Sequence, residues 1–398
     1  MKLKTKINMA TTNEVIKRIE NEISKLQNKD FTFYFFTVDS KNVPSGSVVY
    51  SYELALSLKK LGYKVTMLYQ LENEMNPRHK MKLIEKGTYD PMADNVFCGV
   101  GEWMGQEYAE LPHLNIAKKG AWAVAPSDFL FIPEAFASLM SQTYIYKIPC
   151  QRYVLLYNFD YVTDMIPFGA SWINFGIRDC IATTDLQARL IQDVMPYVRT
   201  KVLNPYIPEY FRKPVTPKKL IVNVISKRQS DVKKLMKTFY WKYPVYKFIA
   251  FKDLRGMARE HYADALKEGA ITVWIDTETP FGFGALEAMR CNNIVIGKIP
   301  ENTQEWMVNE NDELLNNIIW FDNMTDVPDI LADVVASWMQ DEIPQLILDE
   351  MEKTNTRYTK KAWDENVEKL ITDIVSTRVT ELETFKNNNI NNTKNEEE

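Results

Sequence analysis

The chain has 398 residues, of which 45% are apolar and 25% charged, and its formal net charge is −5. This length favours two domains of ordinary size over one large core. The charge balance gives the molecule as a whole no attraction to nucleic acid or to anionic membranes. No apolar run approaches the roughly 20 residues that a membrane span needs, and the basic first 30 residues lack the apolar centre of a secretory signal. We expect those residues to form a helical arm.

The cysteines are scattered along the chain, with no CxxC pair and no histidine close by. This spacing does not fit a zinc site. Buried thiols explain the pattern more simply than disulfides do, which favours a reducing cytoplasm as the setting. Neither a metal ion nor a bound cofactor is expected. The residues concerned are Cys98, Cys150, Cys180 and Cys291.

An α/β pattern begins at residue 31. Residues 31–39 form an apolar, aromatic-rich run of strand length, and residues 49–61 place leucines on one face of a helix. Gly62 stands where a left-handed residue would end that helix, and residues 63–69 alternate as a second strand. The order strand, helix, strand with short connections indicates a parallel sheet. Further short strands are predicted at 129–133, 153–157, 180–183 and 201–203.

A second α/β series follows a proline-rich stretch at 205–217, which is typical of an interdomain linker. Its strands are predicted at 220–225, 246–251, 271–276, 294–297 and 318–321. Parallel strands alternating with helices on both sides of a linker indicate an α/β chain of two doubly wound, Rossmann-like domains. The predicted bounds are a helical arm at 1–30, a first domain at 31–205, a second domain with terminal helices at 206–385 and a disordered tail at 386–398.

The most informative segment is 271–307, where a strand ends at Asp276 and a helix begins near Gly284. Glycines at 282 and 284 let the backbone approach a ligand closely. A helix N-terminus offers N–H groups and partial positive charge that suit a diphosphate. Glu287, near the first turn, can accept hydrogen bonds from sugar or ribose hydroxyls. Spacing alone leaves open an ordinary tight turn in which this glutamate only favours the helix dipole.

The sequence TPFGFGALEAM at 279–289 resembles the donor-binding motif of retaining GT-B glycosyltransferases of the family-4 type. That motif is Glu-Pro-Phe-Gly, four residues and a second Glu within a helix. Residues 45–70 are similar to the family's first βαβ unit, whose glycine-rich loop faces the cleft, and 202–211 to its crossover between domains. The likeness covers most of 31–370, weakly in the first half and specifically in the second. It implies a GT-B fold, a nucleotide-diphosphate-sugar donor and a retaining transfer without metal.

The resemblance also implies the site residues. Arg228 and Lys233, five residues apart after the strand at 220–225, match the family's pair of cations on the donor diphosphate. Such cations would stabilise the leaving group's charge, although an exposed basic face explains them if the resemblance is set aside. Glu305 stands where the family has a further glutamate before the last strand of the site. The predicted donor-binding residues are Gly46, Phe281, Gly282, Phe283, Gly284, Glu287 and Glu305.

Two positions depart from the family pattern. The first glutamate of the motif falls on Thr279, next to Glu278, and the histidine of a His-Asp pair falls on Phe159, while Asp160 is retained. A threonine can still hydrogen-bond a sugar hydroxyl, and in a front-face retaining reaction the donor phosphate itself can take the acceptor's proton. Positioning and charge stabilisation then remain for the protein. The predicted catalytic residues are Arg228, Lys233, Asp160 and Thr279.

Two other functions stay open. Residues 157–162 and 318–323 resemble stretches of phage α-glucosyltransferases that modify DNA, which suggests a hydroxymethylpyrimidine glucosyltransferase. Residues 218–252 hold ten lysines and arginines, one acid and interleaved aromatics, a composition that nucleic acid favours. A solvated helix face with core aromatics explains that stretch more simply. The altered motif positions also suit a degenerate sugar-nucleotide-binding or scaffold protein. The sequence leaves the acceptor open among a glycan, a protein and a DNA base, and leaves the oligomeric state open.

Overall fold

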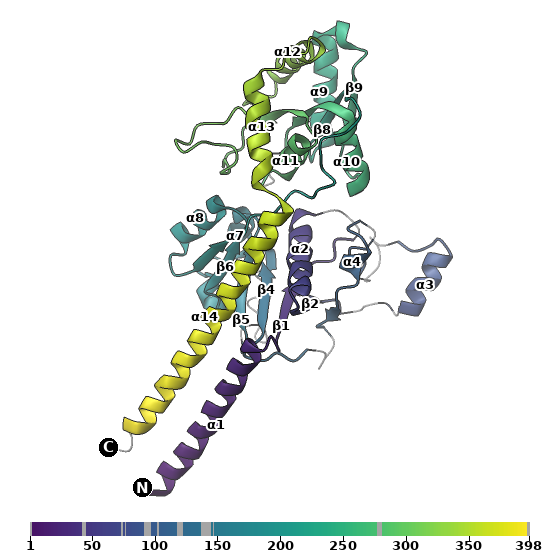
Figure 1. Cartoon of the computed structure of the whole chain (residues 1–398). Helices are drawn as coiled ribbons and strands as arrows, with labels where there is room; N and C mark the ends of the chain where they lie inside the picture. The colour runs from purple at the N-terminus through teal and green to yellow at the C-terminus, as the bar shows by residue number, and fades with distance from the viewer. Residues whose placement is uncertain are drawn as a thin grey trace.

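The computed structural model describes residues 2–41, 45–72, 75, 77–90, 97–101, 103–117, 122–136, 145, 147–276 and 281–395. The chain forms two α/β units, and two long helices project from the first of them (Figure 1). Each unit is built on a parallel sheet, with its own buried apolar core. The predicted class of two doubly wound α/β domains is confirmed.

The first unit holds a seven-stranded sheet in the order β3-β2-β1-β4-β5-β6-β7. Its central strands are buried on both faces, as parallel sheets require. Phe33 and Phe35 of β1 pack in one core, whereas Phe36 packs in another on the opposite face. The three-residue β3 was not predicted, because it is too short to show a period. The strands are β1 (Thr32–Phe36), β2 (Lys64–Tyr69), β3 (His113–Asn115), β4 (Phe129–Pro133), β5 (Gln151–Leu156), β6 (Asp179–Ala182) and β7 (Arg199–Val202).

Helices cover both faces of this sheet. α2 follows β1 and ends as predicted, with Gly62 in the left-handed region at φ 84°. α7 and α8 contribute Val162 and Ile191 to the core of the opposite face. The helices of the unit are α2 (Gly46–Lys60), α3 (Pro77–Glu85), α4 (Gln106–Ala109), α7 (Phe159–Met165) and α8 (Asp185–Val194), with short 3-10 turns η1 (Glu134–Phe136) and η2 (Trp172–Phe175).

The second unit holds a five-stranded sheet in the order β12-β11-β10-β8-β9. The strand predicted at 246–251 starts late, because Pro244 opens a 3-10 turn, η3 (Pro244–Tyr246), before β9 begins. The strands are β8 (Lys219–Ile225), β9 (Ala250–Asp253), β10 (Gly269–Trp274), β11 (Ile294–Lys298) and β12 (Ile319–Phe321). The helices are α9 (Gln229–Lys242), α10 (Arg259–Glu268), α11 (Phe283–Arg290), α12 (Val327–Met339) and α13 (Gln345–Arg357).

The two projecting helices are α1 (Lys2–Gln27) and α14 (Lys360–Asn395), and they lie side by side (Figure 1). α14 follows the second unit in the chain, yet Trp363, Val367 and Ile371 pack into the core of the first. The predicted second domain at 206–385 therefore extends too far, because periodicity shows which face of a helix is apolar but not which sheet it covers. Where a disordered tail was predicted from 386, the structure continues α14 to Asn395.

The crossover between the units is tied to both of them. The Tyr206 hydroxyl donates to Glu53 of α2 at 2.7 Å, and the Asn204 side chain donates to Glu305 of the second unit at 3.0 Å. These bonds hold the start of α2 and the loops after the strands of the second sheet on facing sides of one gap. The relative position of the two units is thus supported by side-chain bonds at the crossover.

All four cysteines are thiols, but Cys98 is only half-buried, so the prediction of four buried thiols is correct for three. In the part of the chain that the structure describes, no helix is long and apolar enough to cross a membrane.

Candidate active site

A cleft of about 360 Å³ opens between the two units at the carboxyl ends of β8, β9 and β10. The first unit contributes Gly46 and Val49 from the start of α2, together with Trp103. The second unit contributes the loops that follow β8, β9 and β10. Ligands of parallel α/β sheets bind at this edge. The cleft therefore lies where the sequence predicts a donor site.

Two predicted donor residues from distant parts of the sequence face each other here. A Cβ atom added to Gly46 would lie 3.8 Å from the ring of Phe283, which is ordinary van der Waals contact. The loop after β1 and the first turn of α11 thus close one end of the cleft together. Only a fold that brings the two Rossmann-like units face to face makes this contact.

The turn before α11 divides into a buried part and an open part. Gly282 has φ 75°, and a Cβ atom there would lie 2.8 Å from the Trp306 ring, so packing and backbone geometry both require glycine. The Trp306 indole N–H donates to the Phe281 carbonyl at 2.8 Å, which holds this residue against the core. Phe283 and Gly284 instead line the cleft. The open end of the helix N-terminus is therefore at 283–284.

Glu287 lines the same cleft and is only 9% exposed. Burial raises the pKa of its carboxyl group to about 7, against the opposing effects of the Arg259 charge and a hydrogen bond from the Tyr262 hydroxyl. The group is thus poised between its neutral and ionised forms near neutral pH. A carboxylate in this position can accept hydrogen bonds from the hydroxyls of a ligand.

The cations of the cleft differ from the predicted pair. Lys227 lines it, with its ammonium 3.7 Å from the Asp276 carboxylate, and Arg259 lines it on the other side. Arg228 caps the start of α9, where its backbone N–H donates to the Ser226 hydroxyl at 3.1 Å, and it is not part of the cleft lining. Lys233 lies further along the exposed side of α9. Lys227, one residue earlier in the chain than Arg228, therefore lines the cleft.

Two of the predicted catalytic residues, Thr279 and Asp160, remain to be placed. Thr279, with its neighbour Glu278, lies outside the described residues. Asp160 lies in the first turn of α7, where its backbone N–H donates to the Asn158 side chain at 3.0 Å, and it does not line the cleft. Phe159 precedes it and packs partly buried in the core of the first unit.

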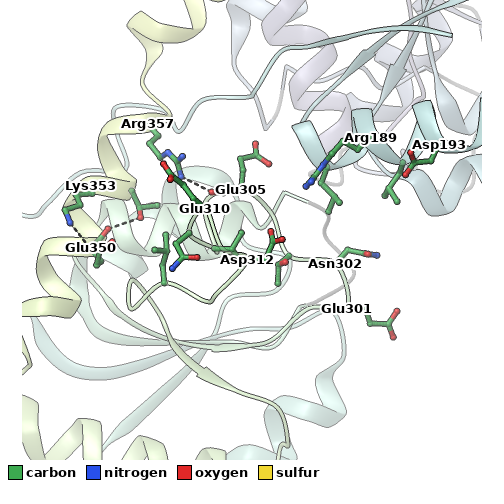
Figure 2. Close-up of a pocket in the computed structure, with 17 residues that line it drawn as sticks. Arg189, Asp193, Glu301, Asn302, Glu305, Glu310, Asp312, Glu350, Lys353 and Arg357 are labelled. Carbon is green, nitrogen blue, oxygen red and sulfur yellow. Dashed lines mark hydrogen bonds and ion pairs between the residues drawn. The ribbon is translucent and has the colours of Figure 1, made fainter. Parts of the chain in front are cut away.

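Glu305 lines a second and larger cleft of about 850 Å³, on another side of the gap between the units (Figure 2). α8 provides Arg189 and Asp193, and α13 provides Lys353 and Arg357. The Arg357 guanidinium donates to the backbone carbonyl of Glu305 at 2.9 Å. Burial raises the pKa of the Glu305 carboxyl group. This cleft has many charges, and none of the described residues that line it is a glycine, although Leu186 in the first turn of α8 is among them.

Sequence reasoning missed Trp103, Lys227, Arg255 and Arg259, which also line the first cleft. The signal for three of them was available, because they lie directly after predicted strands of a parallel sheet or in the helix that follows. The Arg255 guanidinium is held by Asp253, with nitrogen and oxygen atoms 2.6 Å apart. Among the described residues, no group of three or more histidine, cysteine, aspartate or glutamate side chains is arranged to hold a metal ion.

No protein-family model matches this chain, and no curated protein matches its sequence. Solved structures match its fold. Sucrose-phosphate synthase from Thermosynechococcus elongatus superposes with a TM-score of 0.56 at 12% identity, over 87% of this chain and 100% of the other. The pneumococcal O-GlcNAc transferase GtfA, in complex with UDP and GlcNAc, gives 0.56 at 10% identity, over 87% and 99%. HepE from Anabaena, in complex with UDP-glucose, gives 0.55 at 10% identity, over 86% and 99%.

The chain therefore has the GT-B fold of glycosyltransferases, with two Rossmann-like units facing across a cleft, as the sequence predicted. At these identities the likeness establishes the architecture alone. The likeness to the family-4 type and to the phage DNA-modifying enzymes stays a prediction.

Proposed function

We propose that this protein is a glycosyltransferase that moves a sugar from a nucleotide-sugar donor to an acceptor hydroxyl. The observation that carries the proposal is the convergence of Gly46, Lys227 and Glu287 on one cleft between the two units. These residues come from three separate segments, and each has the chemistry that part of such a donor needs. The fold is one that glycosyltransferases use.

The donor diphosphate would lie between the start of α11 and the Lys227 ammonium. The N–H groups of a helix N-terminus favour anions, and a lysine supplies a point charge for a phosphate. Glu287, reached from the next turn of α11, would accept hydrogen bonds from the ribose hydroxyls. Leu254 and Met257, in the loop after β9, give the adjoining part of the cleft an apolar wall for the base.

The transfer would proceed with retention and without metal. In such a front-face reaction the departing phosphate takes the proton of the acceptor hydroxyl, so the enzyme needs to position both substrates and stabilise the negative charge that develops. Lys227 is placed to do the latter from inside the cleft. Roles for Arg228, Lys233, Asp160 and Thr279 in this step remain part of the proposal.

A degenerate protein that binds a sugar nucleotide without turnover is the second candidate. Its support is that a phenylalanine, Phe159, packs where the family has a histidine. Slow release of free sugar from a bound donor distinguishes the two, because only a working site hydrolyses its donor. The DNA-base glucosyltransferase remains a variant of the first candidate that differs in its acceptor.

The direct test is a thermal-shift screen with UDP-, GDP-, ADP- and dTDP-sugars, followed by assay of donor hydrolysis. UDP-glucose and UDP-GlcNAc come first, because they or their parts occupy two of the similar structures. A donor that binds the native state raises the melting temperature by mass action. We expect at least one sugar nucleotide to do so and to be hydrolysed slowly. Failure of all of them to bind would contradict the proposal.

A further inference from the structure

The outer face of α9 is basic along its length and apolar where it ends. Two exposed lysines lie on the same side of the helix as Trp241, three or more residues apart. The exposed run continues through η3 and the residues after it. We call this surface the α9 patch, and it consists of Lys234, Lys237, Trp241, Val245, Lys247 and Phe248. Its three apolar side chains are 75%, 71% and 63% exposed, in chain order.

The exposed aromatics are distinct from those that pack in the core. Between them in the sequence, Phe239, Tyr243 and Tyr246 turn inward, and the Phe239 ring centroid lies 5.9 Å from Tyr243 and 6.0 Å from Tyr246. The Tyr243 hydroxyl is held by Asp329 of α12. The aromatics of this stretch therefore divide into a set that packs the core and a set, Trp241 and Phe248, that faces water. Large apolar side chains gathered on a surface mark sites of interaction.

The patch carries uncompensated positive charge. Beside it, Lys242 pairs with Asp329 at 2.6 Å and Lys252 with Glu268 at 3.5 Å. Within the part of the chain that the structure describes, the three lysines of the patch form no ion pair. Lysines with an ion pair and lysines without one therefore lie along the same stretch, and only those without one offer their charge to a partner.

We propose that the α9 patch docks on the surface of an anionic lipid bilayer. Acidic headgroups complement the lysines, and the interface between headgroups and acyl chains accepts Trp, Phe and Val together. Nucleic acid would match the lysines but offers no apolar medium for Val245. A second copy of the chain would set identical lysines against each other, which opposes association. Of these three partners, the bilayer satisfies both halves of the patch.

The apolar part of the patch lies at the end of α9 that is farther from the donor cleft, whereas Lys234 lies nearer to the start of the helix. Lys227 of the cleft precedes the helix by two residues, and α9 then runs for 14 residues, which is roughly 20 Å. Figure 1 places α9 at the end of the second unit away from the first. The apolar part of the patch, through which a bilayer would dock, is therefore separated from the cleft by the length of α9.

The test is sedimentation of the purified chain with vesicles of phosphatidylcholine, with and without phosphatidylglycerol. We expect binding to the anionic vesicles, weakened by salt. Two double variants, Trp241→Ser with Phe248→Ser and Lys234→Glu with Lys237→Glu, should each lower vesicle affinity about tenfold or more. The matched controls are Phe168→Ser, a fully exposed phenylalanine of the first unit, and Lys361→Glu on α14, which should bind like the native chain.

Brominated lipids supply a second readout, because bromine quenches only indoles that reach the acyl boundary. Quenching should occur with the native chain and be lost in Trp241→Phe, whose other eight tryptophans lie elsewhere. Absence of binding to anionic vesicles would overturn the proposal, as would equal loss in the controls. Binding of a DNA oligonucleotide, without vesicle binding, that disappears in the same double variants would instead assign the patch to nucleic acid.

Discussion

The two clefts both lie between the units, but the side chains that line them differ in chemistry. The cleft of about 850 Å³ is the larger, and its charged lining residues are six carboxylates with two arginines and a lysine, the cations coming from α8 and α13. The cleft of about 360 Å³ joins the open start of α11, the Lys227 ammonium and a nearly buried Glu287 at the carboxyl ends of three parallel strands. The proposed donor site therefore rests on its converging groups and on its edge of the sheet, and volume does not enter the choice.

The largest expected effect concerns Gly282, which shapes the turn before α11, whereas Phe283 and Gly284 line the smaller cleft. Gly282→Val should lower the free energy of unfolding by roughly 2–4 kcal/mol, because it forces a left-handed backbone and a contact with Trp306. Denaturant unfolding measures this loss. Gly62→Val is the control for a left-handed backbone without crowding, since nothing lies within 4 Å of its added Cβ, and it should cost less. Equal losses would show that Trp306 packing does not shape the turn.

The next effect compares the two clefts directly. Glu287→Ala should weaken binding of a sugar nucleotide by about 1–3 kcal/mol, because hydroxyls of the donor lose their acceptor. Glu310→Ala, an exposed residue of the larger cleft that takes no part in the crossover bonds, should leave that affinity unchanged. Calorimetric titration measures both. The reverse pattern would move the donor into the larger cleft.

A pH dependence follows from Glu287. Its pKa rises from 4.5 to about 7 on folding, so the native state holds a proton that the unfolded state has released between those values. This contribution to stability is complete below pH 4.5 and is lost as pH rises to 7, by up to about 1.4 kcal/mol per pH unit. Melting curves of Glu287→Gln should lack this component. If native and variant chains show the same profile from pH 5 to 8, the carboxyl group is not titrating as described.

The smallest effect concerns the cations. Lys227→Ala should weaken donor binding by about 1 kcal/mol, a modest figure because the side chain is 49% exposed and already near Asp276. The same measurement on Arg228→Ala and Lys233→Ala tests whether the donor is bound by the predicted pair of cations or by the lysine that lines the cleft. If Lys227→Ala turns over as fast as the native chain while Arg228→Ala loses turnover, the cation that acts on the donor is the one at the family's spacing and not the one that lines the cleft.

The sequence predicts the architecture well because buried parallel strands are short apolar runs. The strand at Phe129–Pro133 has the bounds predicted for it, and β8 and β11 differ by one residue. β3 is too short to show a pattern. The apolar stripe of α14 indicates a packed helix, but which unit it covers depends on the crossover, which no local pattern contains.

Site residues can be predicted from the sequence where they lie together in one segment. Phe283, Gly284 and Glu287 share a turn and the helix that follows, so a motif can point to them. Trp103, Lys227 and Arg259 reach the cleft from separate elements and meet only once the two units face each other. Lys227 and Arg228 are neighbours, and only the direction in which the chain enters α9 decides which one faces the cleft.

The measurement that tests the central claim most directly is a crystal structure of the protein with UDP-glucose or UDP-GlcNAc. The account predicts the diphosphate at Phe283–Gly284 beside Lys227, with the ribose hydroxyls on Glu287. Nucleotide density against Arg189 and Glu305 in the larger cleft, with the smaller one unaltered, would contradict it.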